Sequence, residues 1–139
     1  DLAGDAELLV SEAAVFGRAA MGEIVHSGTF RDRWRIRREG RLVFADELRF
    51  DSDVARQLER PAILAGNAAM ATVLLVASEC ERFLDPVREI IEDAGGASAW
   101  NGKLLARIAA PDGFSLRRIL IPLLTVLSAG RALPRVWQL

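Results

Sequence analysis

Apolar side chains alternate with arginines between residues 23 and 38, most clearly on either side of Trp34. A period of two is typical of a strand with one apolar and one polar face. The dipeptide Glu39-Gly40 follows, and glycine accepts the positive φ that a tight hairpin turn requires. Apolar residues at even spacing then return over residues 41–50. The pattern therefore predicts a long β-hairpin.

Three other apolar runs also predict strands. They cover residues 6–16, 70–77 and 97–110. Their length and the Gly, Asn and Ser residues near their ends favour strands over helices. The dipeptide Asn101-Gly102 divides the last run, so we expect a second hairpin there. Residues 51–66 are charged and contain Pro and Gly, which predicts a connecting loop with a helical turn over residues 54–59.

A short helix is predicted in the middle of the chain. Asp85 is expected to cap it, Pro86 to occupy its first position and Gly95 to end it. Proline is tolerated there because its missing N–H would have no partner in the helix. The i, i+3, i+4 apolar stripe of this helix consists of Val87, Ile90 and Ile91.

A longer helix is predicted near the end of the chain. Asp112-Gly113 is expected to form a tight turn, and Ser115 is a plausible N-cap for the wide apolar face of residues 116–127. Pro122 lies inside this stretch and removes one backbone hydrogen bond. The helix therefore either kinks at Pro122 or restarts with Pro122 in a new first turn.

The order of these elements predicts a mainly β fold of the α+β class, with one helix mid-chain and one near the C-terminus. A chain of 139 residues, 51% of them hydrophobic, fits a single domain. The tail, residues 133–139, is expected to close the fold with Trp137 buried against the sheet.

Composition excludes several classes of protein. A formal net charge of −1 supplies no general attraction to nucleic acid or to acidic membranes. Cys80 is the only cysteine, which excludes an internal disulfide, and no charged and then apolar leader opens the sequence. The longest apolar runs, such as residues 68–77, are shorter than the ~20 residues of a membrane-spanning helix. These features predict a soluble, cytoplasmic protein.

The chain offers few residues for metal binding or catalysis. Borderline metal ions are usually held by several His and Cys ligands, and this chain has only His26 and Cys80, in different segments. Ligation by His26 with carboxylates such as Glu23 or Glu47 stays open, although a lone strand histidine is more often solvated. Asp46 and Glu47 are adjacent on a strand and face opposite sides, so they form no acid–base dyad. We expect no catalysis.

The arginine row at positions 31, 33, 35 and 37 has three readings. Carboxylates at Asp32, Glu39, Asp46 and Glu47 lie on the same or the paired strand, which favours a solvated face with cross-strand ion pairs. Contact with a protein partner is the second reading. Binding of RNA or DNA is the least favoured, because the chain is nearly neutral.

Residues 17–23 are the densest unusual stretch. Two glycines around small residues permit a closely packed bend in which Met21 belongs to the core. In the functional alternative, Arg18 and Glu23 present charge at this corner to a partner or to a passing cation.

Four sequence segments together carry a family resemblance. They read Val-Phe-Gly-Arg-Ala-Ala-Met-Gly-Glu at 15–23, Gly-Thr-Phe-Arg-Asp-Arg-Trp-Arg-Ile at 28–36, Arg-Leu-Val-Phe-Ala-Asp-Glu-Leu at 41–48 and Leu-Pro-Arg-Val-Trp at 133–137. This pattern resembles the UreD family of urease accessory proteins, also called UreH. Members are typically about twice as long, and the chain matches their C-terminal half, so the N-terminal half is expected to be missing.

The resemblance implies a non-catalytic urease maturation factor with a β-rich, helically wound sheet fold. Members of the family bind apo-urease and, with the accessory proteins UreF and UreG, the latter a GTPase, support nickel insertion. The resemblance also implies that nickel passes through a partly acidic internal tunnel without being bound tightly. Candidates for contact with a partner or with this tunnel are Arg18, Met21, Glu23, Asp46, Glu47 and Glu79. A metallochaperone with its own nickel site is the alternative, and a small enzyme is a third.

Overall fold

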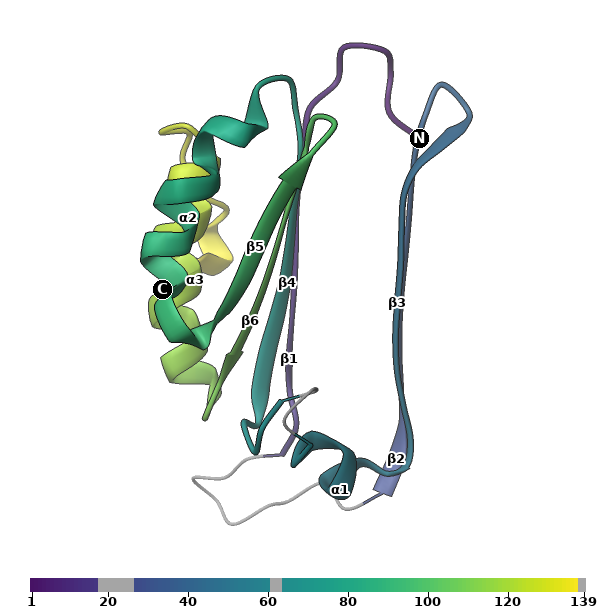
Figure 1. Cartoon of the computed structure of the whole chain (residues 1–139), viewed down its shortest axis with the longest axis vertical. Helices are drawn as coiled ribbons and strands as arrows, with labels where there is room; N and C mark the ends of the chain where they lie inside the picture. Colours follow the sequence, from purple (N-terminus) through teal and green to yellow (C-terminus); the bar gives the residue numbers. More distant parts are fainter. Residues whose placement is uncertain (18–26, 61–63, 138–139) are drawn as a thin grey trace.

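The computed structural model describes residues 1–17, 27–60 and 64–137. Three layers are stacked: two helices, a four-stranded sheet and a two-stranded hairpin (Figure 1). The expectation of an α+β fold rich in strands is confirmed. None of the helices in the described ranges has the length and apolar character needed to cross a membrane.

The middle layer is an antiparallel sheet with strand order β1-β4-β6-β5. Its strands are β1 (Leu8–Val15), β4 (Ala69–Val76), β5 (Gly95–Trp100) and β6 (Lys103–Ala110). The predicted turn between β5 and β6 is confirmed, because Asn101 and Gly102 have positive φ values of 47° and 67°. The hairpin and a short helix come between β1 and β4 in the sequence, although β1 and β4 are neighbours in the sheet. The two edge strands, β1 and β5, belong to distant parts of the sequence.

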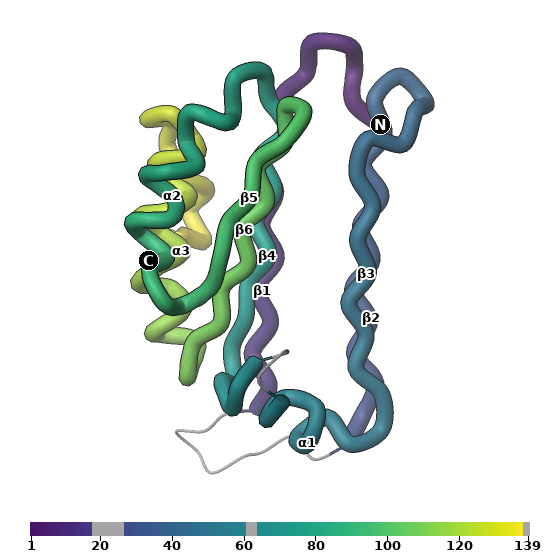
Figure 2. The backbone as a smooth tube through the Cα atoms, viewed as in Figure 1, coloured from purple at the N-terminus to yellow at the C-terminus, as the bar shows by residue number. Residues whose placement is uncertain are grey.

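The second sheet is the predicted hairpin of β2 (Ser27–Arg38) and β3 (Arg41–Asp53). Its turn uses positive φ at Glu39 and Gly40, as expected. Figure 2 shows this ribbon running beside the four-stranded sheet over most of the length of the sheet. A short helix, α1 (Val54–Leu58), begins directly after β3 at the predicted helical turn.

The helix layer covers the face of the sheet that points away from the hairpin. It contains α2 (Leu84–Ile91) and α3 (Gly113–Leu127). The largest apolar cluster of the molecule lies between these helices and the sheet, and it includes Val73, Leu104 and Leu123, each 0% exposed. Alternation along β4 and β6 therefore sends one set of side chains to the helices and the other set to the hairpin.

The predicted ends of α2 are wrong. The N-cap is Phe83, which makes no side-chain cap, and Asp85 lies inside the first turn together with Pro86. A 3₁₀ turn, η2 (Cys80–Phe83), leads directly into the helix, so the chain is already coiled when it reaches Asp85. The helix ends before a second 3₁₀ turn, η3 (Glu92–Ala94), and Gly95 begins β5 instead of ending α2.

The predicted start of α3 is also wrong. Asp112 is the N-cap, and its carboxylate accepts a hydrogen bond from the backbone N–H of Ser115 at 2.8 Å. Gly113 therefore belongs to the helix and not to a separate turn. The helix continues through Pro122 without a restart. Trp137, in the 3₁₀ turn η4 (Arg135–Trp137), is only partly buried, beside Arg117 of α3.

Candidate functional site

A row of polar side chains crosses the four-stranded sheet on the face turned to the hairpin. Glu12 on β1 is the register partner of Thr72 on β4, and Thr72 is the register partner of Arg107 on β6. Residues at the same register position on neighbouring strands project to the same face. Three strands from distant parts of the sequence therefore place their polar residues at one level.

The hairpin adds three side chains to this level. Asp32 and Trp34 lie on β2 at alternate positions, and Asp46 is the register partner of Trp34 on β3. Trp34 is only 8% exposed, so this face of the hairpin is the one that points toward the four-stranded sheet. We call these six residues, Glu12, Asp32, Trp34, Asp46, Thr72 and Arg107, the interlayer polar row.

Two polar contacts join the layers within this row. The indole Nε1 of Trp34 donates to Oε2 of Glu12 at 3.1 Å. The Nη2 atom of Arg107 donates to Oδ2 of Asp46 at 2.5 Å. Hydrogen bonds in which one partner is ionised are the stronger kind, so these contacts fix the hairpin against the sheet.

The pKa of Asp32 is raised above its ordinary value. Burial is the largest cause, followed by the charge of Glu12 and a hydrogen bond to it, and the charge of Asp46 adds to the effect. A hydrogen bond from Trp34 acts in the opposite direction. A carboxyl beside a second carboxylate holds its proton to higher pH, because two like charges at short distance repel.

Two apolar clusters lie on either side of the interlayer polar row, and Trp34 belongs both to the row and to the first cluster. One contains Trp34, Phe44, Leu74 and Val76, and the other contains Phe50, Val54, Leu58 and Leu64. A cavity of about 370 Å³ adjoins the row, and Asp46, Thr72 and Arg107 are among its lining residues. Three carboxyl groups face a single guanidinium here, so the space between the layers has an acidic character.

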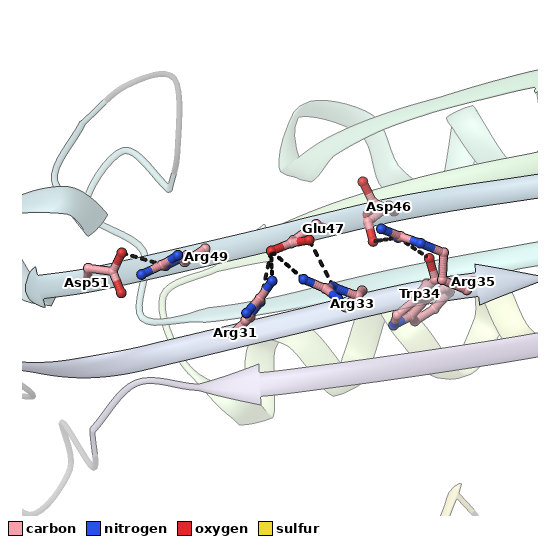
Figure 3. A network of polar contacts seen from close by, with 8 residues as sticks. All are labelled: Arg31, Arg33, Trp34, Arg35, Asp46, Glu47, Arg49 and Asp51. Atoms are coloured by element: carbon pink, nitrogen blue, oxygen red, sulfur yellow. Dashed lines mark hydrogen bonds and ion pairs between the residues drawn. The ribbon is translucent and has the colours of Figure 1, made fainter.

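The structure separates the acidic residues that the sequence nominated. Asp46 belongs to the interlayer polar row, whereas Glu47 lies on the opposite face of β3, between Arg31 and Arg33 (Figure 3). Glu79 follows β4, and its side chain is 83% exposed. The other candidates, Arg18, Met21, Glu23 and His26, lie outside the described residues.

Sequence reasoning missed Glu12 and Arg107, and it placed Asp32 among the carboxylates expected to pair with the arginine row, whereas Asp32 lies on the inward face beside Glu12. A signal for them exists in the alternation of each strand, because each is a polar residue at a position whose neighbours two residues away are apolar. In β2, for example, Asp32 stands between Phe30 and Trp34 on the inward face. One polar residue on the apolar face of a strand is ordinary. A polar residue on the inward face of each of five strands indicates that these residues can meet in the folded protein.

Two other expectations about chemistry can be compared with the structure. The pKa of the Cys80 thiol is raised above its ordinary value; burial is the largest cause, and the charge of Glu81 adds to it. A raised pKa keeps the thiol protonated, which does not favour a metal ligand or nucleophile there. Within the described ranges, no three His, Cys, Asp or Glu side chains are grouped so that they could hold a metal ion.

Comparison with known proteins identifies the family. The family model described as "UreD urease accessory protein" matches residues 1–138. The chain belongs to the UreD family. This finding confirms the resemblance that the four sequence segments carry.

Relatives within the UreD family are about 50% identical to this chain over the region that they share with it. A urease accessory protein UreD of Rhizobium leguminosarum bv. viciae is 53% identical over 140 residues, and one of Mesorhizobium japonicum is 51% identical over 143 residues. The "Urease accessory protein UreD 1" of Brucella abortus biovar 1 is 46% identical over 143 residues. Each match covers 100% of this chain and 51% of the relative. The chain therefore spans about half the length of these relatives, and it matches their C-terminal half.

Proposed function

We propose that this UreD-family chain acts in urease maturation as a non-catalytic scaffold in the cytoplasm. In this proposal it binds apo-urease together with the accessory proteins UreF and UreG, the latter a GTPase, and supports nickel insertion into the urease active site. The relatives are named as urease accessory proteins, which supports the maturation role. Nickel is the cargo of this process and passes without being bound tightly.

The observation that carries the nickel part of the proposal is the acidic side of the interlayer polar row. Glu12, Asp32 and Asp46 come from three strands, and Asp32 lies close enough to the other two between the sheets for their charges to raise its pKa. Oxygen atoms of carboxylates attract divalent cations, and the partly apolar surroundings weaken the competing solvation of those oxygens by water. Arg107 neutralises Asp46 in the resting arrangement, so a passing cation would have to displace this guanidinium.

A matched pair of substitutions tests both parts of the proposal. The protein is co-expressed with the urease subunits and the other accessory proteins, and assembly and urease activity are measured for Asp46→Asn and Glu47→Gln. The two residues are adjacent in sequence but face opposite sides of β3. We expect both variants to co-purify with apo-urease, and only Asp46→Asn to lower urease activation, by about tenfold or more.

Each part of the proposal fails on a different result. Failure of the wild-type protein to co-purify with apo-urease or with any accessory protein overturns the scaffold role. Equal activation by the two variants overturns the role of the interlayer polar row while leaving the scaffold role standing. Stoichiometric, tight nickel binding by the isolated chain would favour the metallochaperone alternative.

A further inference from the structure

The outward face of the hairpin carries five arginines. Four occupy alternate positions on β2 and one lies on β3, and we call this set, Arg31, Arg33, Arg35, Arg37 and Arg49, the outer arginine face. All five residues are exposed. Successive members on β2 are about 7 Å apart, since a strand rises ~3.3 Å per residue. The result is a line of guanidinium groups along one face, of which Figure 3 shows Arg31, Arg33, Arg35 and Arg49.

Two carboxylates neutralise part of this line. Glu47 pairs with both Arg31 and Arg33, at 2.7 and 2.9 Å, and Asp51 pairs with Arg49 at 2.6 Å. Five positive charges therefore meet two negative charges, which leaves an excess of three. Both of these carboxylates lie farther from the turn than Arg35 and Arg37. Two other carboxylates lie at the turn, those of Glu39 and of Asp1, which accepts a hydrogen bond from the backbone N–H of Gly40.

The two members of the outer arginine face nearest the turn, Arg35 and Arg37, bind backbone oxygens instead of carboxylates. Arg35 Nη1 donates to the carbonyl oxygens of Trp34 at 3.0 Å and Asp46 at 3.4 Å. Arg37 Nη1 donates to the carbonyl oxygen of Gly40 at 3.0 Å. Within the described part of the chain, neither guanidinium has a carboxylate in ion-pair contact.

These hydrogen bonds to backbone oxygens hold both guanidinium groups in a fixed position, in which they can bind an external ligand. A guanidinium has five N–H donors, and the backbone contacts of Arg35 and Arg37 use one nitrogen of each. The other donors stay available while the side chain is already held in place, which lowers the entropic cost of binding. Paired N–H donors in this fork geometry match the two oxygens of a carboxylate.

The positions across the strand from these arginines leave room for a ligand. Arg35 faces Ala45, and Arg37 faces Leu42 across a register shift in the hairpin. Leu42 is 51% exposed, so its apolar side chain is open to a partner. Two guanidinium groups without a carboxylate partner therefore flank an uncovered apolar side chain.

We infer that this end of the hairpin, formed by Arg35, Arg37 and Leu42, binds an acidic segment of a partner protein. Carboxylates of the partner engage the two guanidinium groups, and an apolar side chain of the partner covers Leu42. This binding surface does not depend on the proposed role in urease maturation, because it follows from the charge and shape of the hairpin. Arginine beside apolar surface is the composition typical of protein interfaces.

A protein partner fits this surface better than a nucleic acid. The outer arginine face contains two carboxylates, Glu47 and Asp51, which would repel a phosphate backbone following the line of arginines. The chain as a whole has a formal net charge of −1, so it lacks the long-range field that nucleic-acid binding uses. Leu42 adds apolar surface, which a phosphate backbone does not contact favourably.

Fluorescence anisotropy with a defined probe tests the inference. The probe is a labelled decapeptide of alternating glutamate and leucine, and the comparison probes are the same peptide with glutamine for glutamate and a labelled DNA duplex. We expect the acidic peptide to bind more tightly than both comparison probes, and more weakly as salt is raised. The double variant Arg35→Gln/Arg37→Gln should lose about tenfold or more in affinity, and Leu42→Ser should lose less.

The control variant is Arg131→Gln, whose arginine is 80% exposed and lies outside the hairpin. It removes one positive charge, where the double variant removes two, and it should bind the acidic peptide as the wild type does. Circular dichroism and thermal unfolding of each variant separate loss of binding from loss of folding. The inference is overturned if the wild type does not bind the acidic peptide, if duplex DNA binds more tightly, or if the folded double variant binds like the wild type.

Discussion

The indole N–H of Trp34 donates a hydrogen bond to Oε2 of Glu12 across the two sheets, with an N–O distance of 3.1 Å. Trp34 lies on the hairpin and Glu12 on the edge strand of the four-stranded sheet. A shift of β2 by one residue would turn the indole outward and bring an arginine inward. The bond therefore specifies one register between the layers as well as stabilising their contact.

Replacing Trp34 tests the contribution of this bond. Trp34→Phe keeps an aromatic ring but removes the donor, leaving Glu12 with one partner fewer. We expect the free energy of unfolding to fall by about 1–3 kcal/mol, since the bond involves an ionised acceptor and the smaller ring fills less of the core. Urea denaturation measures this change.

The matched control for this substitution changes the acceptor. Glu12→Gln keeps an oxygen that accepts the bond, so it should cost less than Trp34→Phe. A second acceptor variant, Glu12→Ala, removes the bond, and its loss should not be additive with that of Trp34→Phe in the double variant, because both changes act on one contact. Fully additive losses would show that Trp34 acts only through its packing.

The raised pKa of Asp32 predicts how stability depends on pH. The ordinary pKa of an aspartate is 3.8, and burial together with Glu12 raises the pKa of Asp32 in the folded protein. Between pH 3.8, the pKa in the unfolded chain, and the higher pKa in the folded protein, the folded state binds more protons than the unfolded state. The free energy of unfolding contributed by Asp32 therefore falls as pH rises. Its contribution is most favourable below pH 3.8 and is lost as pH rises through the folded pKa.

The variant Asp32→Asn isolates this contribution from those of other carboxyl groups. Asparagine does not titrate, so the variant should gain stability relative to the wild type as pH rises above 3.8. Unfolding by urea, measured at several pH values between about 4 and 8, gives this difference directly. A difference that is constant with pH, or that changes in the opposite direction, would contradict the prediction.

Substitutions in the helix layer should distinguish buried from exposed apolar residues on α3. Leu123 is 0% exposed in the main apolar cluster, whereas Phe114 is 72% exposed on the same helix. Leu123→Ala should lower the free energy of unfolding by about 2–5 kcal/mol, because it removes transfer energy and leaves a cavity. Phe114→Ala should change it by less than about 0.5 kcal/mol. Similar losses for both, measured by urea denaturation, would contradict the layer arrangement.

The strands and the hairpin turns were predictable because their signals are local. A period of two, a strand-like length and the dipeptides Glu39-Gly40 and Asn101-Gly102 determine each of them within a few residues. Helix ends were less predictable. Asp85 has the chemistry of a cap, but coiling begins earlier at η2, where Cys80 is fully buried and its packing decides the path of the chain.

The candidate site was only partly predictable. Asp46 was nominated, and alternation correctly separated it from Glu47, because neighbouring residues of a strand face opposite sides. The meeting of Glu12, Thr72 and Arg107 depends on the register between strands that are far apart in sequence. Alternation within one strand contains no information about which polar residue of another strand will lie beside it.

Two adjacent glycines on β5 give the sharpest test of how the sheet positions Arg107. A Cβ atom on Gly95 would overlap the backbone carbonyl oxygen of Arg107 and lie 2.9 Å from its carbonyl carbon. A Cβ atom on Gly96 would meet nothing within 4 Å. Gly95→Ala should therefore lower the free energy of unfolding by about 1–3 kcal/mol or more, and Gly96→Ala should be nearly neutral.

The backbone shift in Gly95→Ala should also loosen the contact between Arg107 and Asp46, because strand β6 has to move away from β5. Hydrogen exchange detects the movement of β6 away from β5 as faster exchange of the amides that join these strands. Gly96→Ala, which adds the same methyl group, is the control. Equal exchange in the two variants would mean that β6 accommodates the methyl group without moving. In that case the position of Arg107 would be set by its ion pair with Asp46 and not by its strand.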